Sequence, residues 1–424
     1  MQNAFDILKE RGFLYQLTDE EAMRKRLAEG PVTFYTGFDP TANSLHIGHL
    51  LPVMAMRWLQ KCGHRPIALV GGGTAMVGDP SGKTEARPIS TVETIDANVE
   101  ALKAQLSRFL DFGDGKAILA NNADWLRNQK LIDFLRDIGS LFSVARMLTA
   151  ESVKIRLENG LSFLEFSYPL LQSYDFCHLC LHYGCEFQFG GQDQWGNIVA
   201  GVELARRKLG REVYGATYPL LLKSDGTKFG KTAGGAVWLD AEKTSTYDYY
   251  QFWRNSNDSD VRKLLGFFTS LPMEEVNYLS ECGNINRAKE ILAYEATALA
   301  HGHEVAMKAF AAAGNEFGFA DPDMKVQTSS RIVEAASIDL AEDIPTLQLT
   351  AEELGDGMGL LTMMVKAGLC SSNGEARRLI LGGACFVDDA KITDVKTVVT
   401  PASFAGGPIT IKAGKKNRRR VKLS

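Results

Sequence analysis

The sequence predicts an α/β protein in which a parallel sheet with helices on both faces is followed by a helical segment and a small α+β module. Three observations support this fold class. Residues 30 to about 225 alternate short β-branched or aromatic runs with stretches of helical period. Beyond Thr244 the helical period dominates, and after residue 358 short helices give way to short strands.

The strands expected in the sheet are Val32–Tyr35, Ile67–Val70, Ala117–Ala120 and Glu186–Phe189. Between them, helices are expected at Leu50–Gln60 and Val92–Leu110. Ligands of such sheets bind beyond the carboxyl ends of the strands. Polar and glycine-rich segments fall at those ends: Gly37–Pro40, Gly71–Thr74, Asn121–Asn122 and Gly190–Asp193. One pocket could collect all four segments.

The helical segment is expected to contain helices at Tyr247–Trp253, Ser259–Thr269, Met273–Ser280 and one long run, Asn286–Ala313. Residues 318 to about 355 show little period and read as a linker. The last module is expected to contain helices at Leu360–Ala367 and Asn373–Leu381, then strands at Cys385–Val387 and Ile409–Lys412. The chain is therefore divided into domains at residues 1–243, 244–317 and 358–424, with a linker at 318–357.

Composition places the chain among cytoplasmic globular proteins. Its 424 residues are 45% hydrophobic, and no stretch of about 18 uncharged apolar residues predicts a membrane span. The first residues contain no basic segment followed by an apolar run, so no signal peptide is expected. The seven cysteines form no regular framework and are interpreted as reduced thiols.

The net charge of −4 conceals an asymmetry. Residues 358–424 contain 12 Lys and Arg against 4 Asp and Glu, so the remainder of the chain is acidic. A basic module on an acidic body suggests a polyanionic partner, although a solvated tail is the simpler alternative. Because the basic residues are dense near the end of the sequence, RNA binding is the preferred interpretation.

The segment His46-Ile47-Gly48-His49 lies where an expected strand and turn lead into a helix. Two imidazoles three residues apart can both face an anion held at the helix N-terminus, whose N–H groups and dipole also favour negative charge. Glycine between them allows a ligand to approach the backbone. The alternative, for this segment alone, is a surface or metal-binding histidine pair.

A second basic segment is Lys228-Phe229-Gly230-Lys231-Thr232. Two lysines three apart in a glycine-containing loop can reach a phosphate chain, and the Thr hydroxyl adds a donor. Taken alone, the segment is more typical of a charged surface turn.

Two other segments imitate known sites. Gly78–Thr84 resembles a P-loop, but Val77 stands where that pattern needs glycine and Pro80 lacks an N–H, so a Walker site is rejected. Lys83 and Arg87 remain available as mobile cations near a phosphate. The segment Cys177–His182 imitates a zinc site, but it has no second ligand pair at the usual spacing, so packed core thiols are preferred and no metal is expected.

Tyr168, Gln172 and Asp175 have the spacing of residues on one helical face. A phenol, an amide and a carboxylate together could bind a small zwitterion or a phenol. A structural hydrogen-bond network explains the same pattern equally well.

Together, His46–His49 and Lys228–Thr232 resemble the HIGH and KMSKS motifs of class I aminoacyl-tRNA synthetases, in the expected order and separation. The whole chain resembles the bacterial-type tyrosyl-tRNA synthetases. The most specific matches are Tyr35–Thr41, Val77–Pro80, Asp193–Asn197 and Asp225–Thr232. The last module is similar to S4 RNA-binding domains at Ala367–Ser372 and Gly374–Ile380. Two positions differ from the family pattern: Asn43 stands where an acidic residue is frequent, and Gln192 stands where a small residue is frequent.

The resemblance implies a Rossmann-like catalytic domain and a set of roles. Tyrosine would be bound by Tyr35, Asp79, Tyr168, Gln172, Asp175 and Gln194. ATP would be bound by Asp39, Gly48, Gly191, Asp193 and Lys231. Residues acting on the phosphates would be Thr41, His46, His49, Lys83, Arg87, Lys228, Lys231 and Thr232. RNA would be bound by Arg377, Arg378, Lys415, Lys416, Arg418, Arg419 and Arg420.

The resemblance also implies a reaction. L-tyrosine would react with ATP, accompanied by Mg²⁺, to give an enzyme-bound adenylate and pyrophosphate, and tyrosine would then pass to the 3′-terminal adenosine of tRNA(Tyr). A homodimer with its contact near Phe134–Met147 is implied as well. The alternatives are a tryptophanyl-tRNA synthetase, which shares the fold, and a catalytically inactive RNA-binding homologue.

Overall fold

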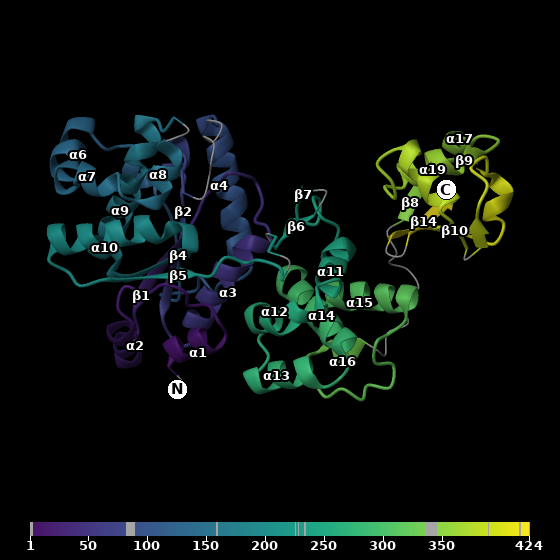
Figure 1. Cartoon of the computed structure of the whole chain (residues 1–424), viewed down its shortest axis with the longest axis horizontal. Helices are drawn as coiled ribbons and strands as arrows, with labels where there is room; N and C mark the ends of the chain where they lie inside the picture. Colours follow the sequence, from purple (N-terminus) through teal and green to yellow (C-terminus); the bar gives the residue numbers. More distant parts are fainter. Residues whose placement is uncertain are drawn as a thin grey trace. The chain divides into compact units, whose positions relative to one another are not determined.

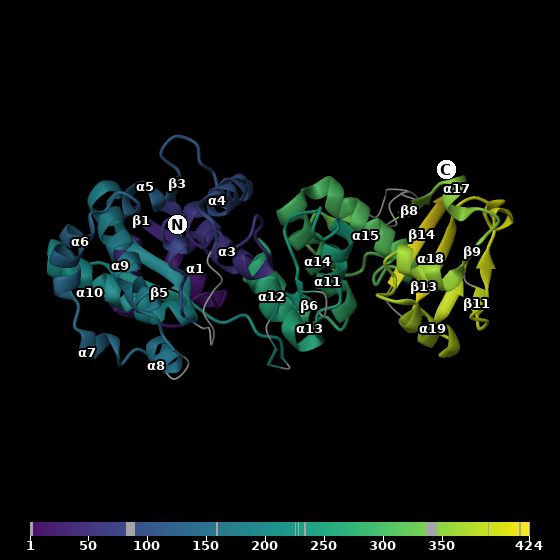
Figure 2. The same cartoon turned by 90° about the horizontal axis from the view of Figure 1, so that it is seen from above.

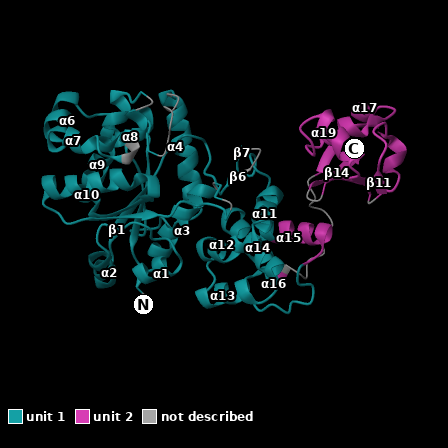
Figure 3. Cartoon of the chain, in the orientation of Figure 1, with its two compact units in different colours: residues 1–306, 320–333 teal, residues 307–319, 334–424 magenta. Residues whose placement is uncertain are grey.

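The computed structural model describes residues 3–81, 90–157, 160–224, 226–227, 229–232, 235–335, 346–388, 390–414 and 417–423. The chain forms two compact units (Figure 3). The first contains residues 1–306 and 320–333, and the second contains residues 307–319 and 334–424. The expected helical domain, 244–317, therefore mostly shares one unit with the sheet.

The first unit is built on a parallel five-stranded sheet with the order β3-β2-β1-β4-β5 (Figures 1 and 2). Its strands are β1 (Thr33–Phe38), β2 (Arg65–Val70), β3 (Ile118–Asn121), β4 (Cys185–Gly191) and β5 (Tyr214–Tyr218). Since β1 pairs with β2 on one side and β4 on the other, the strand order reverses at β1. A sheet of this kind binds ligands in the crevice at that reversal.

Four of these strands were predicted and are confirmed, whereas β5 was missed. Its sequence Tyr-Gly-Ala-Thr-Tyr contains small residues that rarely favour strands. Gly215 is needed there because a Cβ would lie only 2.2 Å from a side-chain carbon of Ile198. Close packing by a helix, rather than local propensity, therefore accounts for the composition of this strand.

Helices cover the sheet and carry the residues at its carboxyl edge. In chain order they are α1 (Ala4–Glu10), α2 (Glu20–Glu29), α3 (Ile47–Lys61), α4 (Val92–Leu106), α5 (Ala123–Leu126), α6 (Leu131–Asp137), α7 (Val144–Met147), α8 (Glu151–Leu157), α9 (Phe163–Tyr183) and α10 (Trp195–Leu209). Ser162 and Glu165 form a reciprocal cap at the start of α9, and Gly184 ends the helix in the left-handed conformation. These signals fix α9, the helix on which Tyr168, Gln172 and Asp175 lie.

The helical segment contains α11 (Thr246–Arg254), α12 (Val261–Phe268), α13 (Met273–Glu281), α14 (Ile285–His301), α15 (His303–Phe317) and α16 (Ile332–Ala335). The prediction of one continuous helix at Asn286–Ala313 was wrong. The run breaks at Gly302, whose φ of 92° is compatible with glycine but not with a continuing helix.

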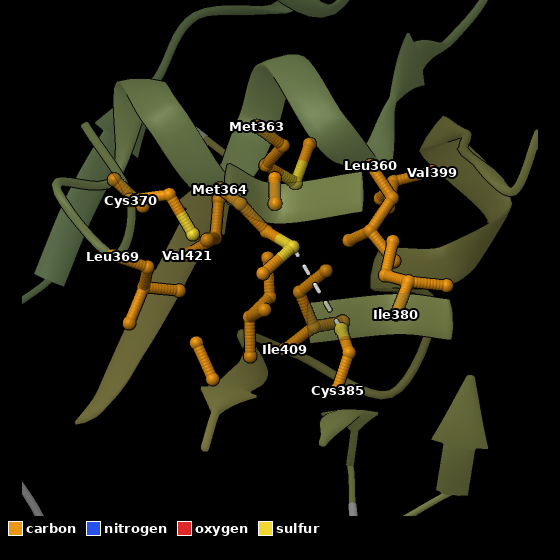
Figure 4. Close-up of a cluster of buried hydrophobic side chains, with 14 of the residues drawn as sticks. Leu360, Met363, Met364, Leu369, Cys370, Ile380, Cys385, Val399, Ile409 and Val421 are labelled. Atoms are coloured by element: carbon orange, nitrogen blue, oxygen red, sulfur yellow. Dashed lines mark hydrogen bonds between the residues drawn. The ribbon is translucent and has the colours of Figure 1, made fainter. Parts of the chain in front are cut away.

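The second unit contains β8 (Thr346–Leu349), α17 (Ala351–Leu354), β9 (Met358–Gly359), α18 (Leu360–Lys366), α19 (Asn373–Leu381), β10 (Cys385–Val387), β11 (Ala390–Ile392), β12 (Val398–Val399), β13 (Ile409–Ala413) and β14 (Asn417–Leu423). Its main sheet has the order β11-β10-β13-β14-β8. The core between sheet and helices includes Met363, Met364, Ile380, Cys385 and Val421 (Figure 4).

Two segments of this unit differ from expectation. The stretch 346–349, expected as linker, is a strand parallel to β14, with Leu347 opposite Val421. The basic run 417–423, for which no strand was predicted, is itself β14, because alternate residues include Val421 and Leu423, which pack on the core. High charge in this run obscured its period of two.

Candidate active site

The first predicted motif lies at the start of α3, where His46 is the N-cap residue. The His46 Nδ1 accepts from the Gly48 N–H at 3.1 Å, and the His49 Nδ1 accepts from the His46 N–H at 3.1 Å. The two rings stack with centroids 3.9 Å apart. An Nδ1 that accepts carries no proton, so the proton of each neutral ring is on Nε2. The helix N-terminus thus presents two adjacent imidazole donors.

His49 contributes hydrogen bonding rather than charge at neutral pH. Burial, and then the neighbouring His46, lowers the pKa of His49 to about 3. Gly48 between them is required by space, because a Cβ would lie 2.8 Å from the His46 ring. An anion held here would therefore receive N–H donors together with the positive end of the α3 dipole.

The second motif is placed beside the first by backbone hydrogen bonds. Gly230, with φ of 85°, accepts from the Val237 N–H at 3.0 Å, and the Val237 carbonyl accepts from the Ile47 N–H at 3.0 Å. Lys231 and Thr232 form β6 (Lys231–Thr232), which pairs with β7 (Gly235–Ala236). The side chains of these two residues, and the whole of Lys228, lie outside the described part of the chain.

Tyr35 on β1 and Asp175 on α9 form a buried pair of a hydroxyl group and a carboxyl group. Tyr35 is 2% exposed, and its hydroxyl has no hydrogen-bond partner among the residues that the structure describes. Burial, and then nearby Asp175, raises the pKa of Tyr35 well above its usual value, so its hydroxyl stays protonated. A buried hydroxyl without a partner inside a cavity is a position where a ligand would bond.

Asp175 is held by two side chains that the sequence analysis did not assign. The Asn122 amide donates to Oδ2 at 2.8 Å, and the Trp125 indole N–H donates to Oδ1 at 2.7 Å. Burial raises the pKa of Asp175 to about 7, although these two hydrogen bonds act to lower it. The Asn121–Asn122 segment had been noted as a polar strand end, but nothing in the sequence marked Trp125.

A second polar cluster surrounds Asp79. The Gln194 amide donates to the Asp79 Oδ2 at 2.5 Å, and the Asn197 amide donates to Gln194 Oε1 at 3.2 Å and to Gln172 Oε1 at 3.0 Å. Burial raises the pKa of Tyr168, with Asp39 and Asp79 adding to the effect. The cluster concentrates acceptor oxygens, which suits an ammonium group.

The two motifs, the Tyr35 and Asp175 pair and the Asp79 cluster all contribute residues to one cavity of about 850 Å³. The predicted site residues that line it are Tyr35, Asp39, Thr41, His46, Gly48, His49, Asp79, Tyr168, Gln172, Asp175, Gly191, Asp193 and Gln194. The lining also includes Gln188, which was not predicted and whose side-chain oxygen is buried with no partner in the described structure. Predicted residues Lys83 and Arg87 lie outside the described residues.

The predicted RNA-binding residues all lie in the second unit. Arg377 and Arg378 are exposed on α19. Arg418, Arg419 and Arg420 lie on β14, where Arg418 is mostly buried with its Nε 3.9 Å from Glu316 Oε1. Lys415 and Lys416 fall outside the described residues.

The sequence matches two protein families. Residues 27–318 match the family described as tRNA synthetases class I (W and Y), and residues 337–420 match the Tyrosine--tRNA ligase SYY-like C-terminal domain. A tyrosine--tRNA ligase of Desulfosudis oleivorans is 50% identical, with 97% of this chain and 96% of that protein covered. The corresponding ligase of Acetivibrio thermocellus is 49% identical over the full length of both chains.

Solved structures show the same similarity. The C-terminally truncated mitochondrial tyrosyl-tRNA synthetase of Aspergillus nidulans superposes with a TM-score of 0.66 and 31% identity. The match covers 75% of this chain and 95% of that one.

Proposed function

Because this chain belongs to the class I tyrosyl-tRNA synthetases and is a tyrosine--tRNA ligase, we propose that its cavity is where tyrosine and ATP react. Tyrosine is attached to tRNA(Tyr) in two steps, through a tyrosyl-adenylate. The observation that carries the proposed site is the buried pair of Tyr35 and Asp175, a protonated hydroxyl without a partner beside a carboxyl group.

This pair suits a phenol because each partner offers a complementary group. The substrate hydroxyl can donate to the Asp175 carboxylate and accept from the Tyr35 hydroxyl. Phenylalanine would leave the Tyr35 hydroxyl without a partner and would offer Asp175 no donor beyond Asn122 and Trp125. Tyrosyl-tRNA synthetases are a known example of this type of discrimination. The acceptors of Asp79, Gln172 and Tyr168 are proposed to bind the α-ammonium group.

The nucleotide is proposed to lie against the N-terminus of α3. The Nε2–H groups of His46 and His49 face its phosphates, and Asp193 with the Gly191 backbone meets its ribose. Mg²⁺ enters with ATP as part of the substrate. We assign the lysines of the second motif, together with Lys83, Arg87 and Thr232, to the departing pyrophosphate.

Catalysis in this arrangement needs no covalent nucleophile from the protein. The tyrosine carboxylate oxygen forms a bond to the α-phosphorus while the bond to the bridging oxygen of pyrophosphate breaks. Charge shifts onto the leaving pyrophosphate during this step. Donors fixed before the reaction stabilise that charge without reorganising, which lowers the barrier.

We further propose that two copies associate through α6 and α7. Leu131, Ile132 and Leu135 on or beside α6, with Val144 and Leu148 near α7, are exposed large apolar residues close together in sequence. Clustered exposed apolar residues are typical of an interface. A second copy of this chain is the occupant proposed for this surface.

The basic residues of the C-terminal unit are proposed to bind tRNA, with Arg377 and Arg378 as the exposed examples. A cytoplasmic location is proposed from these substrates and from the seven cysteines, which are all free thiols. No helix in the described part of the chain combines the length and apolar character needed to cross a membrane.

The decisive experiment is exchange of labelled pyrophosphate into ATP, measured with each of the twenty amino acids in turn. Exchange that depends on tyrosine alone is expected. Exchange that depends on tryptophan, or no exchange with any amino acid, would overturn the proposed use of the site.

A further inference from the structure

Trp238 lies where the two motifs meet, although it does not line the cavity. The Leu239 N–H donates to the Leu45 carbonyl at 2.8 Å, and the Ile47 N–H donates to the Val237 carbonyl at 3.0 Å. These two bonds make a short antiparallel pairing in which His46 is directly opposite Trp238. The backbone that carries Trp238 therefore fixes the start of α3.

The same backbone continues from the hairpin of the second motif. Lys231 pairs with Ala236 in that hairpin, two residues before Trp238. The Val237 N–H also donates to the Gly230 carbonyl at 3.0 Å. A shift of Trp238 would therefore move both the end of α3 that carries the histidines and the loop that carries the lysines.

The Trp238 side chain contacts the His46 ring. Their centroids are 5.9 Å apart, and the rings are inclined at 61° in an edge-to-face arrangement. His49 stacks against the same imidazole. The His46 ring thus has one aromatic neighbour in its own helix and another from the segment after the second motif, so its orientation depends on both.

The indole is itself fastened by Lys243. The Lys243 ammonium lies 4.6 Å from the Trp238 ring centroid, in the geometry of a cation–π contact, and also donates to the side-chain oxygen of Asn43. The backbone N–H of Trp238 donates to the Thr244 hydroxyl at 3.0 Å. Lys243 thereby joins the segment after the second motif to the segment just before His46.

We propose that Trp238 is a positioning residue for adenylate formation. It keeps the His46 ring and the loop of the second motif in fixed positions relative to each other. Lys243, which also bonds Asn43, holds the Trp238 ring in place. This inference rests on the proposed function of the cavity. It assigns Trp238 no contact with substrate, because its effect passes through His46 and the backbone of the loop.

The test compares Trp238→Leu with Trp238→Phe in the full chain. Trp238→Leu removes the ring edge that contacts His46. It should lower kcat for tyrosine-dependent pyrophosphate exchange by between about tenfold and about a hundredfold, the effect of a small misplacement of catalytic groups. The Kd for tyrosine, from equilibrium dialysis, should stay unchanged, and Trp238→Phe should keep most of the rate of the unmodified protein. A Kd that weakens as much as kcat falls would overturn the proposal.

A double-variant cycle separates positioning from general structural damage. His46→Asn keeps an N-cap acceptor but removes the ring. Both variants keep the backbone pairing of Trp238, so what Trp238→Leu removes is the contact of its side chain with the His46 ring. Adding Trp238→Leu to His46→Asn should therefore cost little further kcat, because the two changes remove one shared interaction. Losses that multiply would show that Trp238 acts independently of His46 and would refute the assignment.

Lys243 offers a test in which folding is not at risk, since its side chain is exposed. Lys243→Met should slow exchange several-fold. The matched control is Lys61→Met, because Lys61 lies 4.7 Å from the centroid of Trp58, outside the cavity lining. Equal exchange rates in the two variants would exclude the proposed role of Lys243. Absence of tyrosine-dependent exchange in the unmodified protein would instead contradict the proposed function itself.

Discussion

Asp175 shows how one buried carboxyl group links recognition to pH. Its pKa is raised to about 7, chiefly by burial, from an ordinary value of 3.8. Because the folded state binds this proton more tightly than the unfolded state, the group's contribution to stability is full below about pH 4 and is lost as pH rises through about 7. Ionisation of Asp175, which produces the acceptor for a phenol, therefore lowers the free energy of unfolding.

The first prediction concerns tyrosine binding as a function of pH. Affinity should fall as pH drops below about 7, approaching about tenfold per pH unit, because protonation removes the acceptor for the substrate hydroxyl. Equilibrium dialysis with labelled tyrosine between pH 5.5 and 8.5 measures this. The probe must carry the phenolic hydroxyl, because a ligand without it, such as phenylalanine methyl ester, lacks the group that donates to Asp175.

Trp125→Phe provides the matched variant for this prediction. The change removes the indole donor to Asp175 but keeps an aromatic ring beside His178, against which Trp125 stacks. The midpoint of the pH dependence should move upward, because a bond that favours the carboxylate is lost. An unchanged midpoint would show that another group controls the titration.

At the residue scale, the sequence predicted candidate ligand-binding groups better than the groups that support them. Tyr35, His46 and Asp175 could be predicted because their chemical types fit a family motif. Trp125 and Asn122 could not be assigned, because each lies about fifty positions from Asp175 along the chain and meets it only in the folded protein. Supporting contacts of this kind leave no local pattern.

At the scale of elements, a buried ionic network anchors the segment after α15. The Arg287 Nη1 lies 3.1 Å from Glu290 Oε2, and its Nε lies 3.8 Å from Asp321 Oδ2. The Ala320 N–H donates to the second Glu290 oxygen at 2.9 Å. All three charged side chains are nearly inaccessible to solvent, so each depends on the others for its solvation.

The second prediction follows from this network. Arg287→Met should destabilise the first unit by about 3–5 kcal/mol, because Glu290 and Asp321 both lose a buried cationic partner, although Glu290 keeps the longer contact of 3.7 Å with Arg254. Urea unfolding followed by circular dichroism measures the loss. Arg24→Met removes an exposed arginine that bonds Asp6 through two nitrogens and should leave the midpoint almost unchanged. A similar midpoint for both variants would refute the role of burial.

Helix and strand boundaries show where sequence patterns lose information. The start of α3 was placed at Leu50, but the helix begins at Ile47 because His46 and His49 form a cap that differs from the usual Ser or Thr signal. Gly302 offered a termination signal inside an apolar run, and the run was read through it. In β14, the arginines obscure the alternation of apolar and polar residues in the sequence. The alternation is recognised in the structure, where Val421 is buried in the core and Leu423 packs against it.

At the scale of the whole molecule, the C-terminal unit is expected to serve the second reaction step. The third prediction is that a chain ending at residue 345, just before β8, keeps tyrosine-dependent pyrophosphate exchange but charges tRNA poorly. The advantage of the full chain should shrink between 50 mM and 200 mM salt, roughly as expected for phosphate contacts. Equal charging by both chains at each salt concentration would contradict an RNA-binding role.

The fourth prediction concerns association of two copies. Leu131→Asp should shift the protein toward monomer in analytical ultracentrifugation, because a carboxylate would be placed in an apolar interface. Leu131 and Leu381 are both 68% exposed, but Leu381 lies in the C-terminal unit. Leu381→Asp is therefore the control and should leave the sedimentation coefficient unchanged. Identical behaviour of the two variants would exclude α6 from the contact.

The strand order of the second sheet also bears on synthesis of the chain. Among the described residues of that sheet, β8 pairs with β14 alone, and about seventy residues separate the two strands. During translation, β8 must wait on the order of seconds for its partner to leave the ribosome, whereas the five strands of the first sheet are all complete by Tyr218. A nascent chain would therefore carry a finished catalytic fold beside an unpaired strand, a state that chaperones and proteases could distinguish from the completed protein.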